Sequence, residues 1–391
     1  MGEGNFATFA LTSILSQRER KYDLKIMPMA TSPRPIFVVE NDSFLRLIQV
    51  VLDPTAPQER IEAIAHFCKH DLPDFHGWCA KIRSRVTALY PSDVRLVDHQ
   101  ADLLGKLSGA TVVVVEELAV GAAEITAAGG SLKCVQKYGF TTRNIDHGAC
   151  DKAGVKVLTV RRRANIATAE QGLALMLALT RQLTQTANLI SVEQLRAAGY
   201  EPTVYDRSHT PNGNWARISG LVTLYGKQLG IVGLGEIGRE LALRAIALGM
   251  GIVYAQRTRL PVEVERQYHA TYVSLDELLA TSDCVSLHLP RGPATQGFIG
   301  RPELSLIKPG AFLINVSQPQ LVDREALHEA LASGRLGGYG LDSFYEEPGD
   351  ADDPLLKFRN VIITPHLGGS PRQNWLDDIE ELLVNLARAL G

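Results

Sequence analysis

Cysteine, aromatic residues and long apolar runs are all scarce in this chain of 391 residues. Its five cysteines are odd in number and scattered, which excludes a disulfide framework and favours a reducing compartment, the cytoplasm. No apolar run reaches the roughly 18 residues that a membrane-spanning helix needs. The start, Met-Gly-Glu-Gly, lacks the basic region of a signal peptide, and Phe6 stands where a myristoylation motif has Ser or Thr. We therefore expect a cytoplasmic protein that does not contact a membrane.

An excess of charge of either sign is also absent. There are 40 Lys and Arg residues against 43 Asp and Glu residues, and the formal net charge is -3. This balance argues against a protein that coats nucleic acid, although it does not exclude a local basic patch. Hydrophobic residues make up 45% of the chain, which is enough for a sizeable core and excludes wholesale disorder. At about 150 residues per domain, the length predicts two or three domains.

Short runs of β-branched residues recur along the chain and predict strands. They alternate with segments of helical period, of which 168–180 and 236–248 are examples. Short continuous strands that alternate with helices indicate parallel sheets covered on both faces, so we predict an α/β fold. The predicted strands lie at 36–39, 111–115, 155–160, 229–232, 252–254, 285–287, 311–314 and 361–364.

Three stretches interrupt this alternation. For residues 1–34 we expect a disordered tail, or an upstream start with Met27 or Met29 as the true one; the alternative is an arm that packs on a partner subunit. Residues 53–95 are long and polar, and residues 191–225 are rich in Gly and Pro. Both patterns predict irregular excursions, which are usually functional or disordered.

The strongest chemical signal is the motif G-x-G-x-x-G, formed by Gly233, Gly235 and Gly238. It follows one predicted strand, opens a predicted helix and is followed by a second strand, which is the context of a dinucleotide-binding unit. The first glycine permits a tight turn, the second lets the backbone approach a pyrophosphate, and the third lets helix and strand pack closely. Free N–H groups at the start of the helix favour phosphate. The alternative is a glycine-rich turn without a ligand.

The end of the second strand indicates which nicotinamide cofactor is preferred. NAD-dependent enzymes usually carry an acidic residue there, about 20 residues after the last glycine. This chain has Gln256 instead, followed by Arg257 and Arg259. Because Gln does not repel a 2′-phosphate and Arg257 can pair with one, we predict NADP(H), or use of both cofactors, over strict NAD. The alternative is that the two arginines are a solvated surface pair.

Several motifs occur in a fixed order between about residues 110 and 390. They are the loop 139–146, the helix 169–181, the segment 278–300 with His288-Leu289-Pro290, the segment 307–315, the pairs Leu341-Asp342 and Glu347-Pro348, and Pro365-His366-Leu367-Gly368-Gly369. In this order they resemble the D-isomer-specific 2-hydroxyacid dehydrogenases, a family that includes formate, glycerate and phosphoglycerate dehydrogenases.

The resemblance implies two Rossmann-like domains with doubly wound parallel sheets. The cofactor domain, residues 166–366, would be inserted into a discontinuous, flavodoxin-like substrate domain made of residues 35–165 and 367–391. The chemistry would lie between the domains, and their closure would exclude water. Such enzymes commonly dimerise through the cofactor domain, so a small-molecule substrate and a second copy of the chain are the implied partners.

The family transfers a hydride between a 2-hydroxy acid and a nicotinamide cofactor. The resemblance assigns His366 as the general acid–base and Glu347 as its hydrogen-bonding partner. The Arg that orients the keto acid in the family is missing, because Gln318 stands at its position. Gln can donate a hydrogen bond but carries no charge, and losing one partner of a buried charge pair typically costs about 2–5 kcal/mol. An ordinary 2-keto acid would then be handled poorly unless another cation helps.

Two hypotheses follow from the missing arginine. Either a nearby cation compensates, from Arg161-Arg162-Arg163 near the hinge or from Lys137 and Arg143 beside the substrate loop, or the substrate is an atypical relative of a keto acid. The triple arginine has an equally plain alternative as a solvated turn. The implied substrate contacts are Lys137, Tyr138, Gly139 and Arg161. The implied cofactor contacts are Gly233, Gly235, Glu236, Ile237, Gly238, Gln256, Arg257, Thr258, Leu289, Pro290, Val316, Asp342, His366 and Gly368.

Two other functions stay open. One is a non-enzymatic NAD(P)-binding regulator, against which the retained Glu347 and His366 argue. The other is an enzyme that uses bound nicotinamide for a reaction without net redox change.

One cluster of metal-ligating residue types lies outside these motifs. His66, Cys68, His70, His76 and Cys79 fall within fourteen residues, but their spacing matches no common zinc finger. We therefore predict no metal site.

Overall fold

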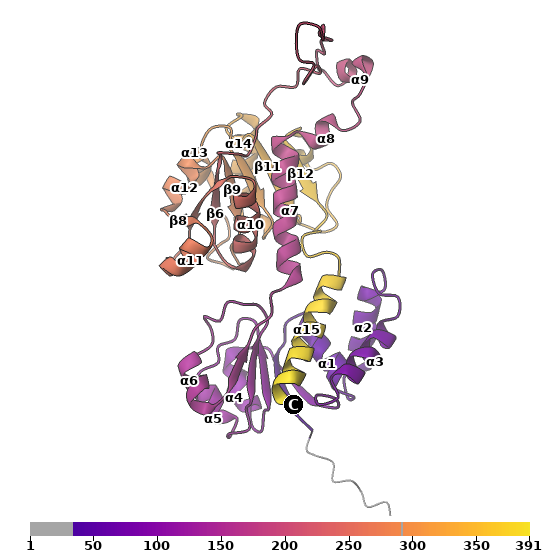
Figure 1. The fold of residues 1–391 in the computed structure, drawn as a ribbon, viewed down its shortest axis with the longest axis vertical. Coiled ribbons are helices and arrows are strands. Elements are labelled where there is room, and N and C mark those ends of the chain that lie inside the picture. The colour runs from indigo at the N-terminus through magenta and orange to yellow at the C-terminus, as the bar shows by residue number, and fades with distance from the viewer. Residues whose placement is uncertain (1–33, 291) are drawn as a thin grey trace, which may run out of the picture. The chain divides into compact units, whose positions relative to one another are not determined.

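The computed structural model describes residues 34–290 and 292–391, so the predicted tail lies almost wholly outside the described residues. Two parallel sheets organise this part of the chain (Figure 1). The first has five strands in the order β2-β1-β3-β4-β5, and the second has seven in the order β12-β11-β10-β9-β6-β7-β8. These sheets confirm the predicted α/β fold with two doubly wound domains.

The first sheet forms because its strands are apolar on both faces. In β3, Val112 and Val114 belong to one core cluster while Val113 and Val115 belong to another, as the two-residue period of a strand requires. The strands are β1 (Ile36–Glu40), β2 (Asp93–Val97), β3 (Val112–Val115), β4 (Cys134–Lys137) and β5 (Lys156–Leu158).

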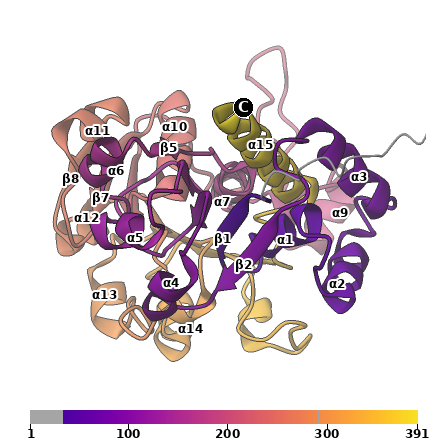
Figure 2. The same ribbon diagram turned by 90° about the horizontal axis from the view of Figure 1, so that it is seen from below.

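Helices cover both faces of this sheet (Figure 2). One face packs against α1 (Arg46–Leu52), α2 (Gln58–Cys68), α3 (Phe75–Arg85) and the last helix, α15 (Gln373–Leu390). The other packs against α4 (Gln100–Lys106), α5 (Ala122–Ala127) and α6 (His147–Ala153). The C-terminal helix thus completes a domain begun by the N-terminal strands, which is the expected discontinuous arrangement. The residue boundaries of the domains stay a prediction.

The prediction of an irregular excursion at 53–95 was wrong. This stretch folds as α2, α3 and β2. Several of its apolar residues, among them Phe75, Cys79 and Ile82, are almost fully buried in the core of the first domain. Because the many polar residues between them make the stretch look like a loop in the sequence, its two regular helices were not predicted.

The second sheet carries the glycine motif at its centre. The strand order reverses between β6 and β9, and ligands of doubly wound sheets bind at such a switch point. The strands are β6 (Gln228–Val232), β7 (Gly251–Ala255), β8 (Ala270–Tyr272), β9 (Cys284–Leu287), β10 (Phe312–Asn315), β11 (Gly338–Asp342) and β12 (Val361–Thr364).

Two long helices, α7 (Arg163–Thr180) and α10 (Glu236–Ala247), belong to the core on one face of the second sheet. Three others, α12 (Leu275–Thr281), α13 (Arg301–Leu306) and α14 (Arg324–Ala332), belong to the core on the opposite face. The short elements are α11 (Val262–Gln267) and the 3-10 turns η1 (Pro319–Leu321) and η2 (Pro354–Lys357).

The segment after α7 leaves the sheet (Figure 1). It contains α8 (Leu183–Thr186) and α9 (Val192–Ala197), and from there to β6 it has no further helix or strand, as its Gly and Pro content predicts. Several of its apolar side chains are exposed, including those of Ile190, Val204 and Tyr225.

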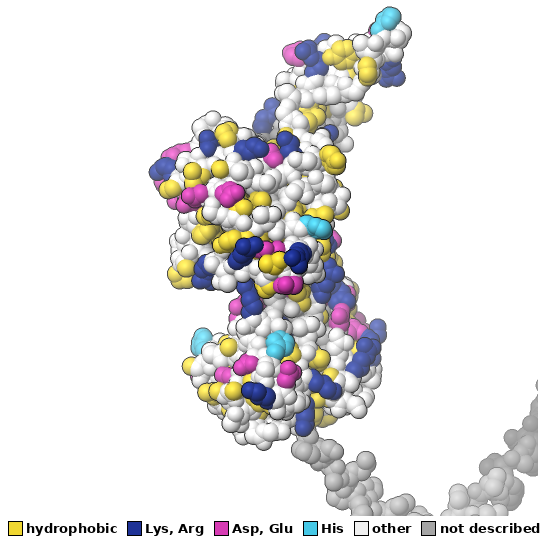
Figure 3. All heavy atoms as spheres, turned by 60° about the vertical axis from the view of Figure 1, so that its left-hand side comes forward, with side chains coloured by type: hydrophobic (Ala, Val, Ile, Leu, Met, Phe, Trp, Pro, Cys, Tyr) yellow, Lys and Arg dark blue, Asp and Glu magenta, His cyan; other side chains and the backbone are white. Residues whose placement is uncertain are grey.

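The surface carries charges of both signs. On the face shown in Figure 3, basic and acidic side chains are interspersed over the described residues. None of the helices in the described ranges is both long and apolar enough to span a bilayer.

Candidate functional site

The loop after β6 has the shape that a dinucleotide phosphate requires. Gly233 has a φ of +92°, and a Cβ there would lie 2.6 Å from the carbonyl oxygen of His288. A Cβ on Gly238 would lie 2.6 Å from the carbonyl oxygen of Gly233, so this glycine is needed for close packing. Around Gly235 there is open space, and α10 begins at the next residue with its N–H groups free for phosphate. The residues present therefore fit the pyrophosphate of NAD or NADP.

The end of β7 separates the roles of the two arginines. The side chain of Gln256 accepts a hydrogen bond from the backbone N–H of Leu234 at 3.1 Å, which ties this strand to the glycine loop. Arg259 forms a bidentate pair with Glu265 at 2.8 and 2.9 Å, and this partner lowers the pKa of Glu265 to about 2. Arg257 is exposed and makes no ion pair with another described residue. Of these two arginines, only Arg259 is therefore engaged by a carboxylate of the described chain.

The other implied cofactor residues surround the same loop or follow neighbouring strands. The side chain of Leu289 lies 3.2 Å from where a Cβ on Gly233 would be. Ile237 packs against the core of the second domain. Val316, just after β10, lies against Gly172 of α7. Thr258 accepts a hydrogen bond from Gln256 at 2.6 Å through its backbone, and Pro290 is exposed.

His366 and Glu347 form the expected pair. The Nδ1 atom of His366 lies 3.0 Å from Oε2 of Glu347, and both side chains reach solvent. The other oxygen of Glu347 accepts a hydrogen bond from the backbone of Phe344 at 3.0 Å. Its hydrogen bond with His366 holds the pKa of Glu347 below its usual range. Because Nδ1 is engaged, Nε2 is the ring atom that can exchange a proton with a substrate oxygen.

The buried carboxylate of Asp342, at the end of β11, fixes the turn that carries His366. It accepts hydrogen bonds from the N–H groups of Leu367 at 2.8 Å and Gly368 at 2.6 Å, and from the hydroxyl of Thr364 at 2.6 Å. A Cβ on Gly368 would lie 2.8 Å from this carboxylate, so only glycine fits. Asp342 therefore orients His366 through the Thr364 hydroxyl before it and the two backbone N–H groups after it.

Gln318 opens the turn η1 after β10. Its carbonyl oxygen accepts a hydrogen bond from Asn315 at 2.8 Å. With uncharged neighbours it lines a cavity of about 410 Å³, while His366 and Glu347 are not part of that lining. The lining residues in the described chain are Gly292, Pro293, Thr295, Gln296, Gln318, Gln320 and Leu321.

The predicted substrate residues Lys137 and Tyr138 are buried within the first domain. The Lys137 amine donates a hydrogen bond to the backbone of Glu116, and the ring of Tyr138 lies 4.1 Å below the guanidinium of Arg162. Gly139, with a φ of +131°, instead brings its backbone against Glu236 of the other domain. For all three residues a contact with substrate stays a prediction.

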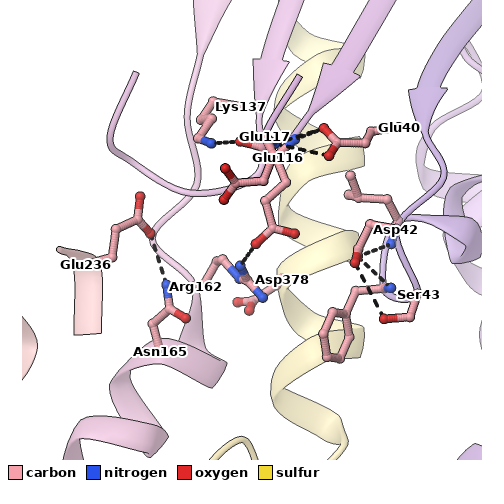
Figure 4. A network of polar contacts seen from close by, with 12 residues as sticks. Glu40, Asp42, Ser43, Glu116, Glu117, Lys137, Arg162, Asn165, Glu236 and Asp378 are labelled. Atoms are coloured by element: carbon pink, nitrogen blue, oxygen red, sulfur yellow. Dashed lines mark hydrogen bonds and ion pairs between the residues drawn. The ribbon is translucent and has the colours of Figure 1, made fainter. Parts of the chain in front are cut away.

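The three consecutive arginines reach three different elements, which corrects the alternative of a solvated turn. Arg161 forms a bidentate pair with Glu240 of α10 at 2.7 Å for both bonds. Arg162 pairs with Glu116 at the end of β3 (Figure 4).

Arg163, the third, binds Asp378 of α15 at 3.0 Å and Glu381 at 2.7 Å. Each guanidinium is matched by a carboxylate, and a role for any of them in place of the missing arginine stays a prediction.

One part of the site was missed from the sequence. The carboxylate of Glu236, expected to contact cofactor, accepts hydrogen bonds from the loop at Phe140 and Thr141. It also accepts one from the side chain of Asn165 (Figure 4). The partners of Glu236 lie 71 to 96 residues away from it along the chain, and no local sequence pattern predicts such a contact.

Of the His and Cys residues between 66 and 79, the two cysteines take part in packing, whereas His66, His70 and His76 are exposed. Cys68 and Cys79 are buried in the core of the first domain, and burial raises their thiol pKa to about 11 and 12. Within the described ranges, no three His, Cys, Asp or Glu side chains gather in a way that could hold a metal ion.

Comparisons with known proteins agree with this architecture. A model of the D-isomer-specific 2-hydroxyacid dehydrogenase, NAD-binding domain, matches residues 173–368. A D-3-phosphoglycerate dehydrogenase of Archaeoglobus fulgidus is 33% identical over 302 residues, which cover 76% of this chain and 53% of that protein. A glyoxylate reductase of Thermococcus litoralis is 37% identical over 244 residues, 62% of this chain and 69% of that one. The chain belongs to the D-isomer-specific 2-hydroxyacid dehydrogenase family.

Solved structures give the same family. A glyoxylate reductase from Paecilomyes thermophila is 26% identical with a TM-score of 0.50, covering 92% of this chain and 96% of that one. The apo form of Rhodotorula graminis D-mandelate dehydrogenase is 25% identical with a TM-score of 0.52, covering 91% and 94%. The chain spans about half the length of the phosphoglycerate dehydrogenases that it matches.

Proposed function

We propose that the chain is an oxidoreductase that transfers a hydride between NADP(H) or NAD(H) and a 2-hydroxy or 2-keto acid, or an atypical related carbonyl compound. The single observation that supports this most is the His366–Glu347 pair, at 3.0 Å, on a turn anchored by Asp342. That turn follows β12, in the same sheet whose switch point carries the glycine loop. A regulator that only binds cofactor needs neither the pair nor the anchor.

The residues divide the chemistry between them. A reduced nicotinamide held at the glycine loop would supply the hydride that the carbonyl carbon receives and would itself be oxidised. His366 in its charged form gives a proton from Nε2 to the carbonyl oxygen, and the product is an alcohol. Glu347 holds Nδ1 and stabilises the imidazolium before the transfer. Gln318, as proposed, donates a hydrogen bond to the substrate where the family uses Arg.

We propose NADP(H) as the preferred cofactor, with NAD(H) also used. Supporting this, the end of β7 presents the neutral Gln256 and the exposed Arg257, and it lacks a carboxylate for ribose hydroxyls.

A homodimer built through the cofactor domain is proposed as the assembly. Its support is the exposed apolar set on the segment after α7, where Ile190 is 81% exposed, Val204 74% and Tyr225 79%. A cytoplasmic location is proposed because all five cysteines are free thiols and buried.

The test follows absorbance at 340 nm with each cofactor and a panel of 2-keto acids and their uncharged analogues. We expect consumption of reduced cofactor in the wild-type protein and its loss in His366→Asn. Cofactor binding, followed by fluorescence, should remain in that variant. Cofactor binding without turnover of any carbonyl compound would favour a non-enzymatic regulator. Turnover of substrate without net change of the cofactor would favour an enzyme whose reaction has no net redox change.

A further inference from the structure

The carboxylate of Glu236 occupies a nest of donors on the loop after β4. Its Oε1 atom accepts hydrogen bonds from the backbone N–H groups of Phe140 and Thr141, both at 2.7 Å, and from the Thr141 hydroxyl at 2.9 Å. Its Oε2 atom accepts from the side chain of Asn165 at 3.0 Å. Glu236 is the first residue of α10, in the cofactor domain. Its hydrogen bonds to the loop after β4 therefore join the cofactor domain to the substrate domain.

The loop is shaped to hold a carboxylate. Consecutive backbone N–H groups that converge on one oxygen form a binding site for anions, and charge-assisted hydrogen bonds of this length are strong. Gly139, directly before these donors, has a φ of +131°, and a Cβ there would come within 2.6 Å of Oε1. Glycine is therefore required for the chain's own carboxylate to seat.

This loop is also the proposed substrate loop, so the filled nest affects what can bind. A substrate carboxylate that approached it would find the donors engaged and a fixed negative charge in place. Two of the nearby cations are engaged elsewhere, whereas Arg143, two residues after Thr141, is exposed and forms no ion pair with another described residue. Arg239, on the same helix, bonds the carbonyl of Leu234 and interacts electrostatically with Glu236, and Arg162 is matched by Glu116.

The second determinant is Gln318. Where the family resemblance expects a cation, this chain has an amide that can both donate and accept a hydrogen bond. Neither Glu236 nor Gln318 carries a positive charge that would stabilise a negatively charged group of the substrate. Both suit a neutral group, since the carboxylate of Glu236 accepts hydrogen bonds and Gln318 serves either role.

We propose that Glu236 is a specificity-determining residue that, with Gln318, directs this site to carbonyl compounds whose group next to the reacting carbon is an uncharged hydrogen-bond donor, a carboxamide being the simplest case. This rests on the proposed hydride transfer. The oxidised and reduced partners would then be a 2-keto amide and the matching 2-hydroxy amide, with the same transfer of hydride and proton.

The decisive comparison uses pyruvate and pyruvamide, which differ mainly in charge. In the wild-type protein kcat/KM should be at least about tenfold higher for pyruvamide. Glu236→Ala, which empties the nest, should raise kcat/KM for pyruvate by a similar factor. Glu236→Gln should raise it by a smaller factor, because this change removes the charge but keeps the side chain in place. Glu263→Ala is the matched control, since Glu263 is an exposed carboxylate on α11 of the same domain. It should leave the preference unchanged.

A binding measurement separates this proposal from the proposed function. Oxalate is titrated calorimetrically into the complex with reduced cofactor, and Glu236→Ala should bind it at least about tenfold more tightly than the wild type. Equal affinity, or a wild-type preference for pyruvate, would overturn the role of Glu236 while hydride transfer stands. If no carbonyl compound is reduced although cofactor binds, the proposed function fails, and the substrate assignment fails with it.

Discussion

His366 and Glu347 meet through Nδ1 and Oε2 at 3.0 Å, although 18 residues separate them in the chain and His366 sits in the left-handed region with a φ of 58°. Residues other than glycine rarely adopt that region, and here the hydrogen bonds to Asp342 hold the turn. The strained backbone therefore serves to aim one imidazole ring.

Loss of this ring should remove the chemistry and leave the fold. We expect His366→Asn to lower kcat by about 10²- to 10⁴-fold, because general acid–base catalysis contributes in that range. Glu347→Gln should lower kcat by a smaller factor and shift the acid limb of the pH–rate profile. The sign follows from the lowered pKa of Glu347: the ionised carboxylate persists as pH falls below its usual value and is lost only on passing the lowered one. An unchanged profile in Glu347→Gln would contradict this role.

A positive charge at position 318 should improve the reduction of 2-keto acids. Gln318→Arg is expected to raise kcat/KM for glyoxylate or pyruvate by about 30-fold, the lower end of what a charged partner contributes. Gln296→Arg is the control, since Gln296 is exposed and lines the same cavity. A gain in both variants would mean that charge anywhere in the cavity is enough. No gain in either would point to different chemistry.

Cofactor preference should depend on one arginine. Arg257→Ala is expected to weaken the binding of NADPH by about tenfold or more and to leave that of NADH unchanged, because only the former carries a 2′-phosphate. The exposed Arg266 provides the control variant Arg266→Ala. Fluorescence titration with both cofactors measures this. Equal loss for NADH and NADPH would show that Arg257 acts on the fold or on the common part of the cofactor.

His288 should make stability depend on pH. Burial lowers its pKa to about 4, while the unfolded chain has the ordinary value near 6.5. Between these values the unfolded state binds more protons, so the protein loses stability as pH falls from 6.5 to 4. We expect Tm to fall less steeply over this range in His288→Gln than in the wild type. The exposed His328 gives the control, and an equal slope in all three proteins would contradict the assignment.

The exposed apolar segment after α7 should control assembly. Ile190→Glu combined with Val204→Glu is expected to convert a dimer into a monomer, because charges at a buried interface are costly. Sedimentation velocity measures this, with Val262→Glu on α11 as a control at a comparably apolar, exposed position. A wild-type protein that sediments as a monomer would refute the proposed dimer.

Much of the fold could be read from the sequence because many strands bury both faces. β3 is four valines, and such a run has few alternatives to a central parallel strand. β4 and β11 escaped detection for a physical reason. β4 places Gln136 and Lys137 in the interior, and β11 contains Gly338 and Gly340, where a Cβ would lie about 3.1 Å from side chains of α7. Their burial is imposed by neighbours and leaves no local apolar signal.

In the site, too, features with a local sequence signal could be predicted, and features that depend on distant contacts could not. The glycine loop and the placement of His366 beside Glu347 follow motifs with local spacing, and the structure brings those residues together. The contact between Glu236 and Thr141 joins residues 95 positions apart, and its donors are backbone groups that no residue type reveals. The ion pairs of the three hinge arginines could not be predicted from the sequence either. They depend on how elements distant in the chain, such as α10 and α15, pack in the fold.

The first turns of α10 hold two sites at once. Its leading N–H groups point to where a pyrophosphate would sit, while Glu236 and Glu240, one turn apart, hold the substrate loop and Arg161. A small displacement of this helix on cofactor binding would therefore be transmitted to the loop through Glu236. Thermodynamic linkage makes the effect reciprocal, so whatever substrate gains from cofactor, cofactor gains from substrate. The consequence is that each of the two ligands would change the affinity for the other by the same factor, whichever binds first.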